Sequence, residues 1–349
     1  MRTVLARVWL AALISVCAVL LSAGAAPANH VSCGDVITQD TKLDSDLTCA
    51  GGGVTVEGEG DVTLDLGGHT IDVSDSGIAV LASEGRIVVR NGTITESGTA
   101  IEADGPDALL VEDLLIEGNS IGVSCQFTPE CRVRDSALRY QGDIGIWMHA
   151  PDSGGSGAVI DNQIYNNGIG VRLEHYTAPI RGNRIEENEG EGVEIGFTSQ
   201  VEMSHNLVAR NGGDGVAVLF LSAATIADNE IQDNGANGVR VVGDFFFENT
   251  TAFVRRNRVL RNGDDGVRVE NAEGAPGTVI ERNRTDRNAD DGIDVDAAEP
   301  SGVDTVVRAN KAYFNADLGI EASPGTTDGG GNKARHNGNP AQCVGVRCK

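Results

Sequence analysis

Residues 224–241, ATIADNEIQDNGANGVRV, carry the pattern that decides the fold, because the chain repeats it on both sides with little change. Asn229 is followed five residues later by Asn234 and nine residues later by Gly238. The same asparagine recurs at intervals of 21 to 28 residues at Asn162, Asn183, Asn206, Asn257, Asn283 and Asn310. A fixed internal period of this length is typical of a solenoid, in which no repeat can bury its apolar face alone.

Each repeat contains three short apolar segments that alternate as strands do. After the glycine, for example, Val239 and Val241 are separated by Arg240, which is the period of a strand with one buried face. Three β-branched strands in each turn, bounded by Asn and Gly, predict an all-β fold, a parallel β-helix of about twelve turns. The asparagine suits a left-handed bend, and a stacked asparagine column can pass amide hydrogen bonds along the axis.

Two motifs in the early turns carry a family resemblance. The segments LDLGGHTI at residues 64–71 and VRNGTI at residues 89–94 resemble secreted bacterial right-handed parallel β-helix repeat proteins of the pectate-lyase-like group. The resemblance covers roughly residues 33–348. It implies a right-handed coil and a link to polysaccharides, but it does not specify a reaction. The sequence lacks the Asp-Pro-His-Asp of mannuronan epimerases and the Gly-His-Gly of polygalacturonases.

The first 28 residues read as a secretory signal peptide. Arg2 and Arg7 precede an apolar run at residues 8–21, and small residues follow it, with a cleavage pattern after Ala25 or Ala28. A retained membrane helix is the alternative, but the run is shorter than the roughly 20 residues such a helix needs. We therefore expect a secreted or cell-surface protein with an amino-terminal cap at 29–60, the β-helix at 61–340 and a disulfide-stapled end at 341–349.

The mature chain keeps six cysteines, and an exported chain with an even number favours disulfides over metal or redox use. Six cysteines allow 15 pairings. Proximity in the sequence favours Cys33 with Cys49, Cys125 with Cys131, and Cys343 with Cys348. The first and last pairs lie at the ends of the repeats, where they would staple the open ends of the solenoid.

The chain is acidic, with 51 Asp and Glu against 27 Lys and Arg and a net charge of −24. This balance argues against nucleic acid and anionic membrane surfaces as partners, because both attract Lys and Arg. Solubility alone is a sufficient explanation, since the acidic residues are spread along the repeats. We expect a monomer with no membrane span in the mature chain.

We call the strands that follow the repeat glycine the glycine strands. Near Trp147 their outward residues are aromatic and ionisable. Rings cover sugar faces and polar groups fix hydroxyls, so this composition predicts a sugar site. The candidate catalytic residues are His149, Arg172, His175 and Glu194. The candidate substrate-binding residues are Trp147, Glu174 and Tyr176. In this hypothesis either histidine is a general base and Arg172 stabilises a carboxylate-bearing sugar. The alternative is that the rings only cover the sheet and Arg172 pairs with Glu194 across the ladder.

A second cluster is acidic and contains Asp265, Asp291 and Asp294. Paired carboxylates could hold calcium, which is the candidate cofactor, or could perform glycoside hydrolysis. Asp265 and Asp291 directly precede the repeat glycine, however, and an Asp-Gly bend needs no catalytic reason.

Two functional hypotheses follow from these patterns. The first is a secreted protein that binds and processes an extracellular polysaccharide on the outer face of the glycine strands, as a lyase, hydrolase or epimerase. Loops of variable length at residues 151–157, 243–251, 271–277 and 297–304 would overhang this face. The second hypothesis is a structural or adhesive rod at the cell surface without an active site, because the fold supports both functions.

Overall fold

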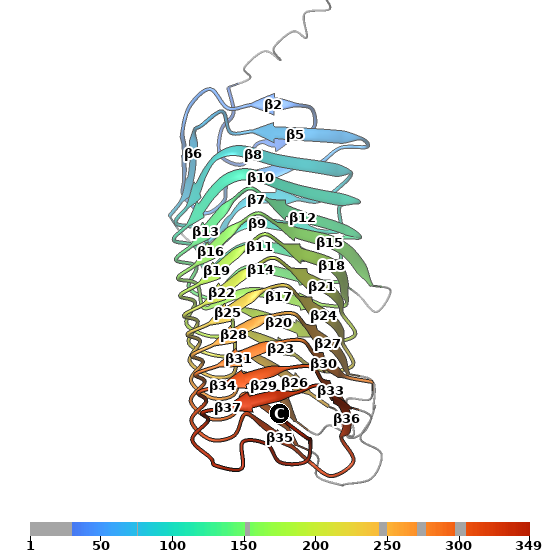
Figure 1. Ribbon diagram of the computed structural model, residues 1–349. Coiled ribbons are helices and arrows are strands. Elements are labelled where there is room, and N and C mark those ends of the chain that lie inside the picture. Colours follow the sequence, from blue (N-terminus) through green and yellow to red (C-terminus); the bar gives the residue numbers. More distant parts are fainter. Residues whose placement is uncertain (1–29, 75, 151–153, 244–249, 271–276, 297–304) are drawn as a thin grey trace, which may run out of the picture.

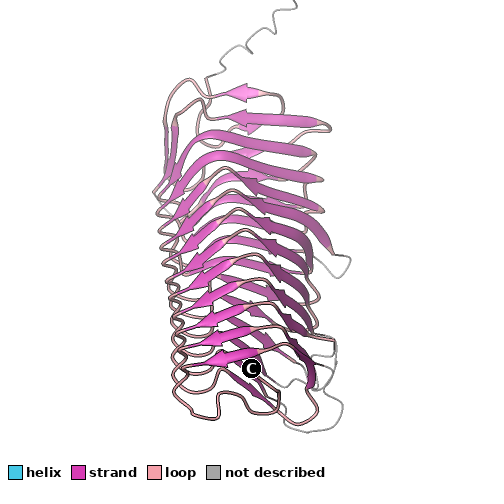
Figure 2. Cartoon of the chain, viewed as in Figure 1, coloured by secondary structure: helices cyan, strands magenta, loops and turns pink. Residues whose placement is uncertain are grey.

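The computed structural model describes residues 30–74, 76–150, 154–243, 250–270, 277–296 and 305–349. The described chain winds into a parallel β-helix that contains strands and no helix (Figures 1 and 2). The prediction of an all-β solenoid is therefore confirmed. The predicted leader and most of the predicted variable loops fall outside the described residues. No helix of the described chain combines the length and hydropathy needed to cross a membrane.

One side of the coil is a 13-stranded parallel sheet, which we call sheet A and which receives one strand from each turn. Its strands in spatial order are β1 (Val36–Ile37), β4 (Val54–Val56), β7 (Ile78–Ala82), β9 (Thr99–Asp104), β11 (Ile121–Gln126), β14 (Ile144–His149), β17 (Ile169–Glu174), β20 (Val193–Gly196), β23 (Val216–Val218), β26 (Val239–Val242), β29 (Val267–Glu270), β32 (Ile293–Val295) and β35 (Ile320–Ala322). These are the glycine strands of the repeat.

The other two strands of each turn form sheet B, which bends between two ladders and faces the viewer in Figure 1. The first ladder contains β2 (Thr41–Lys42), β5 (Asp61–Asp65), β8 (Arg86–Thr95), β10 (Ala108–Glu117), β12 (Glu130–Arg134), β15 (Gly155–Ile160), β18 (Tyr176–Arg181), β21 (Gln200–Ser204), β24 (Ala223–Ala227), β27 (Thr251–Arg255), β30 (Val279–Glu281), β33 (Val306–Arg308) and β36 (Thr327–Gly330). The second contains β3 (Leu47–Cys49), β6 (Thr70–Val73), β13 (Ala137–Arg139), β16 (Gln163–Tyr165), β19 (Arg184–Glu186), β22 (Leu207–Ala209), β25 (Glu230–Gln232), β28 (Arg258–Leu260), β31 (Arg284–Asp286), β34 (Lys311–Tyr313) and β37 (Lys333–Arg335). Strands β8 and β10 run through both ladders.

Equivalent residues of successive turns stack directly on one another. On sheet A, Val193, Val216, Val239 and Val267 are consecutive partners, and all four are fully buried. Each such column removes apolar surface from water, which stabilises the fold by about 25 cal/mol for each Å² buried. Because no turn can do this alone, the core is continuous along the whole coil.

Buried asparagines line the bend between the two ladders of sheet B. At Asn162 the backbone N–H donates to Asn183 Oδ1 at 2.9 Å, and Nδ2 donates to the same oxygen and to the Val133 carbonyl at 2.9 Å. We call this column the amide ladder, and it runs through Asn162, Asn183, Asn206, Asn229, Asn257, Asn283, Asn310 and Asn332. A second ladder five residues further on includes Asn167, Asn188 and Asn211. The predicted transfer of amide hydrogen bonds along the axis is confirmed.

The left-handed bend is not at the asparagine itself, contrary to our expectation. The preceding residue has the positive φ, 59° at Asp228 and 57° at Asp233. The asparagine is therefore free to turn its amide inward, where it satisfies backbone groups that the corner leaves unpaired. The bend and the hydrogen bonding are divided between two neighbouring residues.

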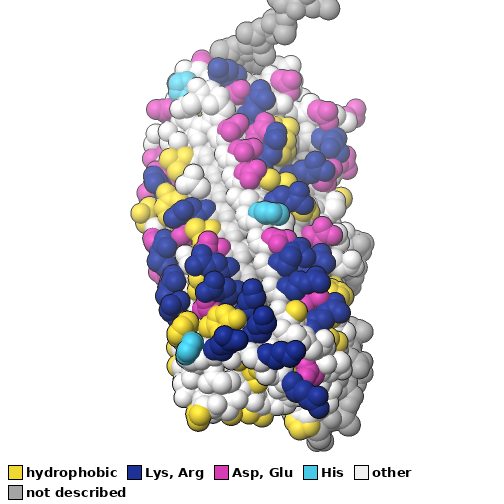
Figure 3. Space-filling view, in the orientation of Figure 1, with side chains coloured by type: hydrophobic (Ala, Val, Ile, Leu, Met, Phe, Trp, Pro, Cys, Tyr) yellow, Lys and Arg dark blue, Asp and Glu magenta, His cyan; other side chains and the backbone are white. Residues whose placement is uncertain are grey.

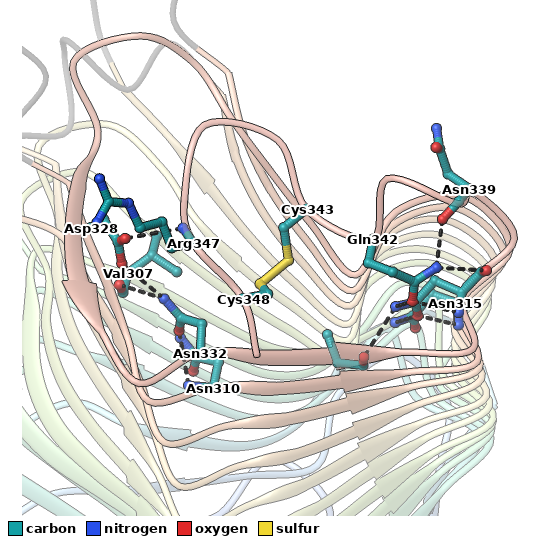
Figure 4. The surroundings of a disulfide bond; sticks show 12 residues. Val307, Asn310, Asn315, Asp328, Asn332, Asn339, Gln342, Cys343, Arg347 and Cys348 are labelled. Carbon is teal, nitrogen blue, oxygen red and sulfur yellow. Dashed lines mark hydrogen bonds between the residues drawn. A yellow bond between two sulfur atoms is a disulfide. The ribbon is translucent and has the colours of Figure 1, made fainter.

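All three predicted disulfides are formed, Cys33–Cys49, Cys125–Cys131 and Cys343–Cys348. Disulfides persist in oxidising compartments, in agreement with an exported chain. At the carboxyl end the tail crosses the last turn (Figure 4). There Gln342 ends the second column of asparagines, because its side-chain oxygen accepts a hydrogen bond from Asn337 Nδ2 at 3.0 Å. Isolated bridges join Ile320 to Cys343 and Asn332 to Cys348. This segment covers the open end of the solenoid.

The coil begins earlier than we expected. Strand β1 already pairs with β4 in sheet A, and β2 and β3 pair with the next turn in sheet B, so residues 36–56 are a turn of the helix rather than a separate cap. In the early turns of sheet A, Leu81 is the partner of Glu102, whereas Ala79, two residues earlier, is fully buried. The early repeats lack the asparagine that marks the register elsewhere.

Candidate functional site

The outer face of sheet A carries the predicted column of polar residues. Trp147 on β14 is directly opposite Arg172 on β17, and Arg172 is opposite Glu194 on β20. Two residues further along the same strands, His149 is opposite Glu174. The parallel register therefore brings together these five candidates from consecutive turns, as the repeat spacing indicated.

Glu174 is the centre of this group. One of its oxygens, Oε2, lies 2.8 Å from His149 Nδ1 and accepts a hydrogen bond from Trp147 Nε1 at 3.2 Å. The next position in the ladder is Gly196, and a Cβ there would meet nothing within 4 Å, so Glu174 lies beside open space. A histidine whose Nδ1 is held by a carboxylate presents its other nitrogen in a fixed orientation, which is an arrangement that a general base needs.

Arg172 and Glu194 form an ion pair across the ladder. The Nε of Arg172 lies 3.1 Å from Glu194 Oε1, and its second guanidinium nitrogen lies 3.2 Å from Oε2. Both groups are mostly buried by their neighbours. The pairing is the one that the alternative, purely structural interpretation anticipated, so this contact alone does not distinguish the two hypotheses.

Tyr176 is a correction, because it does not belong to the exposed site. It is the first residue of β18, its side chain is 1% exposed, and its hydroxyl donates to the Thr128 carbonyl. His175 has a left-handed φ of 60°, so the chain turns the corner there and directs the next side chain into the core. The ring lies over Gly155, where a Cβ would come within 2.6 Å of it. Burial raises the pKa of the Tyr176 hydroxyl.

An exposed row of rings runs along the axis at the same corner of the coil. We call it the aromatic column, and its rings are those of Phe127, His149, His175, Phe197 and Phe220. Successive centroids are 6.4, 6.0, 6.0 and 5.1 Å apart. The three phenylalanines are between 45% and 53% exposed.

The aromatic column spans five consecutive turns, which corresponds to roughly 19 Å at the strand spacing. The Trp147 ring lies beside it, 5.9 Å from His149. Sequence reasoning located the two histidines, but it missed Phe127. The signal was present, since Phe127 stands at the end of its glycine strand, just as His175 does.

The acidic cluster is part of a third buried column, which we call the acidic column, formed by Asp214, Asn237, Asp265 and Asp291. Each side chain accepts the backbone N–H of the residue one turn later; Asp265 Oδ1, for example, accepts from Asp291 N at 2.8 Å. Asp265 also pairs with Arg268 at 3.0 Å. These residues therefore close the bend before the repeat glycine, as the structural alternative predicted.

The three predicted metal ligands do not form one group. Asp291 and Asp294 gather with Glu321, whereas Asp265 gathers with Asp264 and Asp290. Burial raises the pKa of Asp265 to about 6, that of Asp294 to about 7 and that of Asp291 to about 8. At Asp291 the neighbouring carboxylates, Asp265 first among them, add to the rise.

Comparison with known proteins assigns the family. Residues 33–211, more than half of the chain, match the family described as periplasmic copper-binding protein (NosD), and residues 152–275 match the right-handed β-helix region. The chain belongs to the NosD family, and the predicted right-handed β-helix of the pectate-lyase-like group is confirmed. A search of curated proteins finds no match.

Solved structures show the same fold at low sequence identity. The A-module of mannuronan C-5 epimerase AlgE6 from Azotobacter vinelandii is 15% identical, with a TM-score of 0.59 over 89% of this chain and 91% of that one. The periplasmic alginate epimerase AlgG is 14% identical, with a TM-score of 0.60 over 79% of this chain and 74% of that one. At such identities the likeness concerns the fold.

The family description raises the question of copper, and the donor atoms do not fit it. Copper favours imidazole, thiolate and thioether ligands. Within the described residues the groups of three or more candidate ligands consist of Asp and Glu alone. The six cysteines described are in disulfides, and Met148 and Met203 are buried in the core. His149 and His175 are neighbours with centroids 6.0 Å apart, and in the described chain no third ligand of this kind joins them.

Proposed function

We propose that the protein binds an extended extracellular polysaccharide along the aromatic column, at the corner where the strands of sheet A end. The observation that carries this proposal is the continuous row of exposed rings over five turns, bordered by Trp147 and Glu174. Exposed rings in contact with one another present flat apolar surface to successive sugar faces, while carboxylate and imidazole groups reach hydroxyls. The epimerases of similar fold act on a polysaccharide, which is consistent with the proposal.

Processing of the polysaccharide is the second part of the proposal. His149 is the favoured general base, because its Nδ1 lies 2.8 Å from Glu174 Oε2, so that Nε2 is the nitrogen left for a ligand. His175 is the neighbouring candidate, with Nδ1 3.0 Å from the Thr198 hydroxyl. Arg172 and Glu194 either bind a charged substituent of the polysaccharide or serve only as the ion pair that they already form. Because the epimerase motif is absent from the sequence, the reaction type is left open and ligand binding is the function proposed.

The binding test uses alanine variants and a matched aromatic control. A glycan array probed with the mature protein identifies a ligand, and calorimetry then gives its affinity. Trp147→Ala and Phe197→Ala should each weaken binding by about 1 to 3 kcal/mol through lost ring contact. Phe253 is exposed to the same degree but lies on sheet B, so Phe253→Ala should bind like the parent. If Trp147→Ala and Phe197→Ala bound the glycan as tightly as Phe253→Ala and the parent do, the aromatic column would be refuted as the binding site.

The candidate metal is tested separately. Calcium prefers carboxylate oxygens, so Asp291, Asp294 and Glu321 are proposed as its ligands. Millimolar calcium should raise the melting temperature of the parent and leave Asp294→Asn unchanged, whereas copper should stabilise neither. A rise with copper and none with calcium would contradict this assignment.

Localisation at the cell surface or in the surrounding medium is part of the same proposal. An extended polysaccharide is accessible there, and three disulfides suit an oxidising compartment. Fractionation of cells that express the full chain, with amino-terminal sequencing of the product, tests both export and cleavage after Ala25 or Ala28.

A further inference from the structure

Basic side chains gather over the last turns of sheet B, on a protein whose net charge is −24. In Figure 3 Lys and Arg crowd the lower half of this face, while Asp and Glu are more frequent in its upper half. We call this patch the basic face, and its side chains belong to β31, β34, β37 and the bends beside them. They are Arg282, Arg284, Arg287, Lys311, Lys333 and Arg335.

Three of these cations form a straight column. Arg284 is directly opposite Lys311, and Lys311 is directly opposite Lys333. All three are exposed on the outer side of the sheet. Like charges directly opposite each other on neighbouring strands destabilise a sheet. The column is therefore unfavourable for folding by itself, unlike the amide ladder that lies beside it.

Earlier turns of the same face neutralise their cations, and the basic face does so only in part. Arg256 pairs with Asp228 at 2.7 Å, Arg258 with Glu230 at 2.9 Å and Arg261 with Asp233 at 2.6 Å, each one turn back.

In the basic face Arg284 reaches Asp286 at 2.5 Å, and Arg282 lies 3.8 Å from Glu281, which Arg308 already pairs. No carboxylate in the described part of the chain forms an ion pair with Lys311, Lys333 or Arg335. Several cationic groups thus face solvent without a counter-ion from the described residues.

A stack of rings runs parallel to the cation column. The Phe314 and His336 rings are 5.1 Å apart and nearly parallel, at 13°, and the Arg287 guanidinium lies 5.1 Å above the Phe314 ring. Phe314 is 48% exposed. A ring of this kind offers its face or edge to a sugar, and the cations beside it offer charge-assisted hydrogen bonds to carboxylates.

We propose that the basic face binds a linear polysaccharide that carries carboxylate groups. The polysaccharide would lie parallel to the solenoid axis. Its carboxylates would contact Arg284, Lys311 and Lys333, and one of its sugars would contact Phe314. The cations are spaced by one turn, about 4.8 Å, so successive charges of an extended polyanion meet successive turns. This surface is on sheet B, separate from the aromatic column at the end of sheet A, and the inference does not depend on the function proposed there.

A polysaccharide fits the basic face better than a nucleic acid duplex does. Duplex DNA has one charge for roughly every 1.7 Å of its axis and needs a wide basic surface. The basic face is narrow, because the cations of the preceding turn, Arg256, Arg258 and Arg261, are already paired with carboxylates of the turn before that. A carboxylated polysaccharide has at most one charge for each sugar, so its charge density suits a single column of cations.

The test compares a charge-neutralised variant with a matched control. The probes are an oligogalacturonate, which has one carboxylate per sugar, and a neutral malto-oligosaccharide of equal length, measured by calorimetry at 50 and 300 mM NaCl. Lys311→Gln, Lys333→Gln and Arg335→Gln combined should weaken oligogalacturonate binding at least tenfold. The control combines Arg86→Gln, Arg132→Gln and Arg134→Gln, which removes three charges from early turns of the same sheet and should change affinity less than twofold.

Two further measurements complete the test. Binding by the parent should fall at least tenfold between the two salt concentrations. Lys311→Arg with Lys333→Arg should bind like the parent, because both substitutions keep the positive charge.

Binding of the neutral probe in preference to the charged one would overturn the proposal. So would unchanged affinity in the triple Gln variant, or a preference for duplex DNA or phosphatidylserine vesicles over oligogalacturonate. If Trp147→Ala alone lost oligogalacturonate, the charged polysaccharide would belong to the aromatic column, and this assignment would be wrong.

Discussion

The amide ladder in the bend of sheet B and the acidic column in the bend before sheet A perform the same structural task with different chemistry. In both columns a buried side chain accepts a backbone N–H from a neighbouring turn. The asparagines also donate, so that Asn162 Nδ2 meets Asn183 Oδ1 and the Val133 carbonyl. Asp265 and Asp291 have no amide to donate.

The acidic column contains its own internal reference. Asn237 donates both its backbone N–H and its Nδ2 to Asp214 Oδ1 at 2.9 Å. Two turns further on, the Asp291 backbone N–H makes the equivalent bond to Asp265, but the side-chain donor is missing. The comparison shows that equivalent buried positions accept the two side chains on different terms. An amide is buried there without an electrostatic cost, whereas a carboxylate needs a raised pKa or a cation partner.

The largest expected effect is the loss of one rung of the amide ladder. Asn162→Ala removes the acceptor of the Ser136 N–H and the donor to Val133, leaving buried polar groups unpaired. Each such group costs about 1 to 3 kcal/mol, so we expect a loss of about 3 kcal/mol in the free energy of unfolding. Urea unfolding followed by circular dichroism measures it. Gln163→Ala, at the exposed neighbouring amide, should change stability by less than about 0.5 kcal/mol. A ladder variant as stable as this control would contradict the role assigned to the ladder.

A change in the opposite direction is expected in the acidic column. Asp291→Asn supplies the missing donor to Asp265 and removes a buried carboxylate, so it should stabilise the protein by about 2 kcal/mol at pH 8.5 in calcium-free buffer. The exposed neighbour provides the control, Asp290→Asn, which should have a much smaller effect. Destabilisation by Asp291→Asn at this pH would show that the carboxylate has a role beyond closing the bend.

The same pKa shifts predict an unusual pH dependence of the parent. The pKa of Asp291 is raised to about 8 from a usual value near 3.8, so between these pH values the folded state holds a proton that the unfolded state releases. Stability must therefore fall as the pH rises through this window. We expect a loss of about 2 kcal/mol between pH 6 and pH 7.5, measured by urea unfolding. Asp291→Asn should remove most of this slope, and a parent that is most stable at pH 8.5 would refute the assignment.

The smallest effect is expected where the carboxylate already has a cation. Asp265 pairs with Arg268, which also reaches Asp294 at 2.6 Å. Asp265→Asn relieves burial of a charge but breaks this pair, and the two effects oppose each other. We expect a net change within about 1 kcal/mol, measured by the same urea unfolding. A loss of stability comparable with that of Asn162→Ala would show that Asp265 is as important for folding as the amide ladder.

The site shows where repeat reasoning succeeds and where it ends. Register in a parallel sheet is set by the repeat, so the grouping of Trp147, Arg172 and Glu194 could be predicted from spacing. The burial of Tyr176 could not, because it depends on the left-handed corner at His175 and on the room that Gly155 leaves for the ring. Corner residues break the alternation on which strand predictions depend.

The sequence by itself determined the parallel β-helix and its stacked columns, because a regular repeat gives each residue the same neighbours in every turn. The three disulfide pairs followed from the proximity of the cysteines in the sequence. Only the tertiary structure decided which charges are paired. The repeat places Arg284, Lys311 and Lys333 in one column, each directly after a ladder asparagine, but the structure shows that Lys311 and Lys333 form no ion pair with the described residues. The raised pKa of Asp291 likewise comes from burial beside other carboxylates. Both properties depend on distances between turns, which composition does not contain.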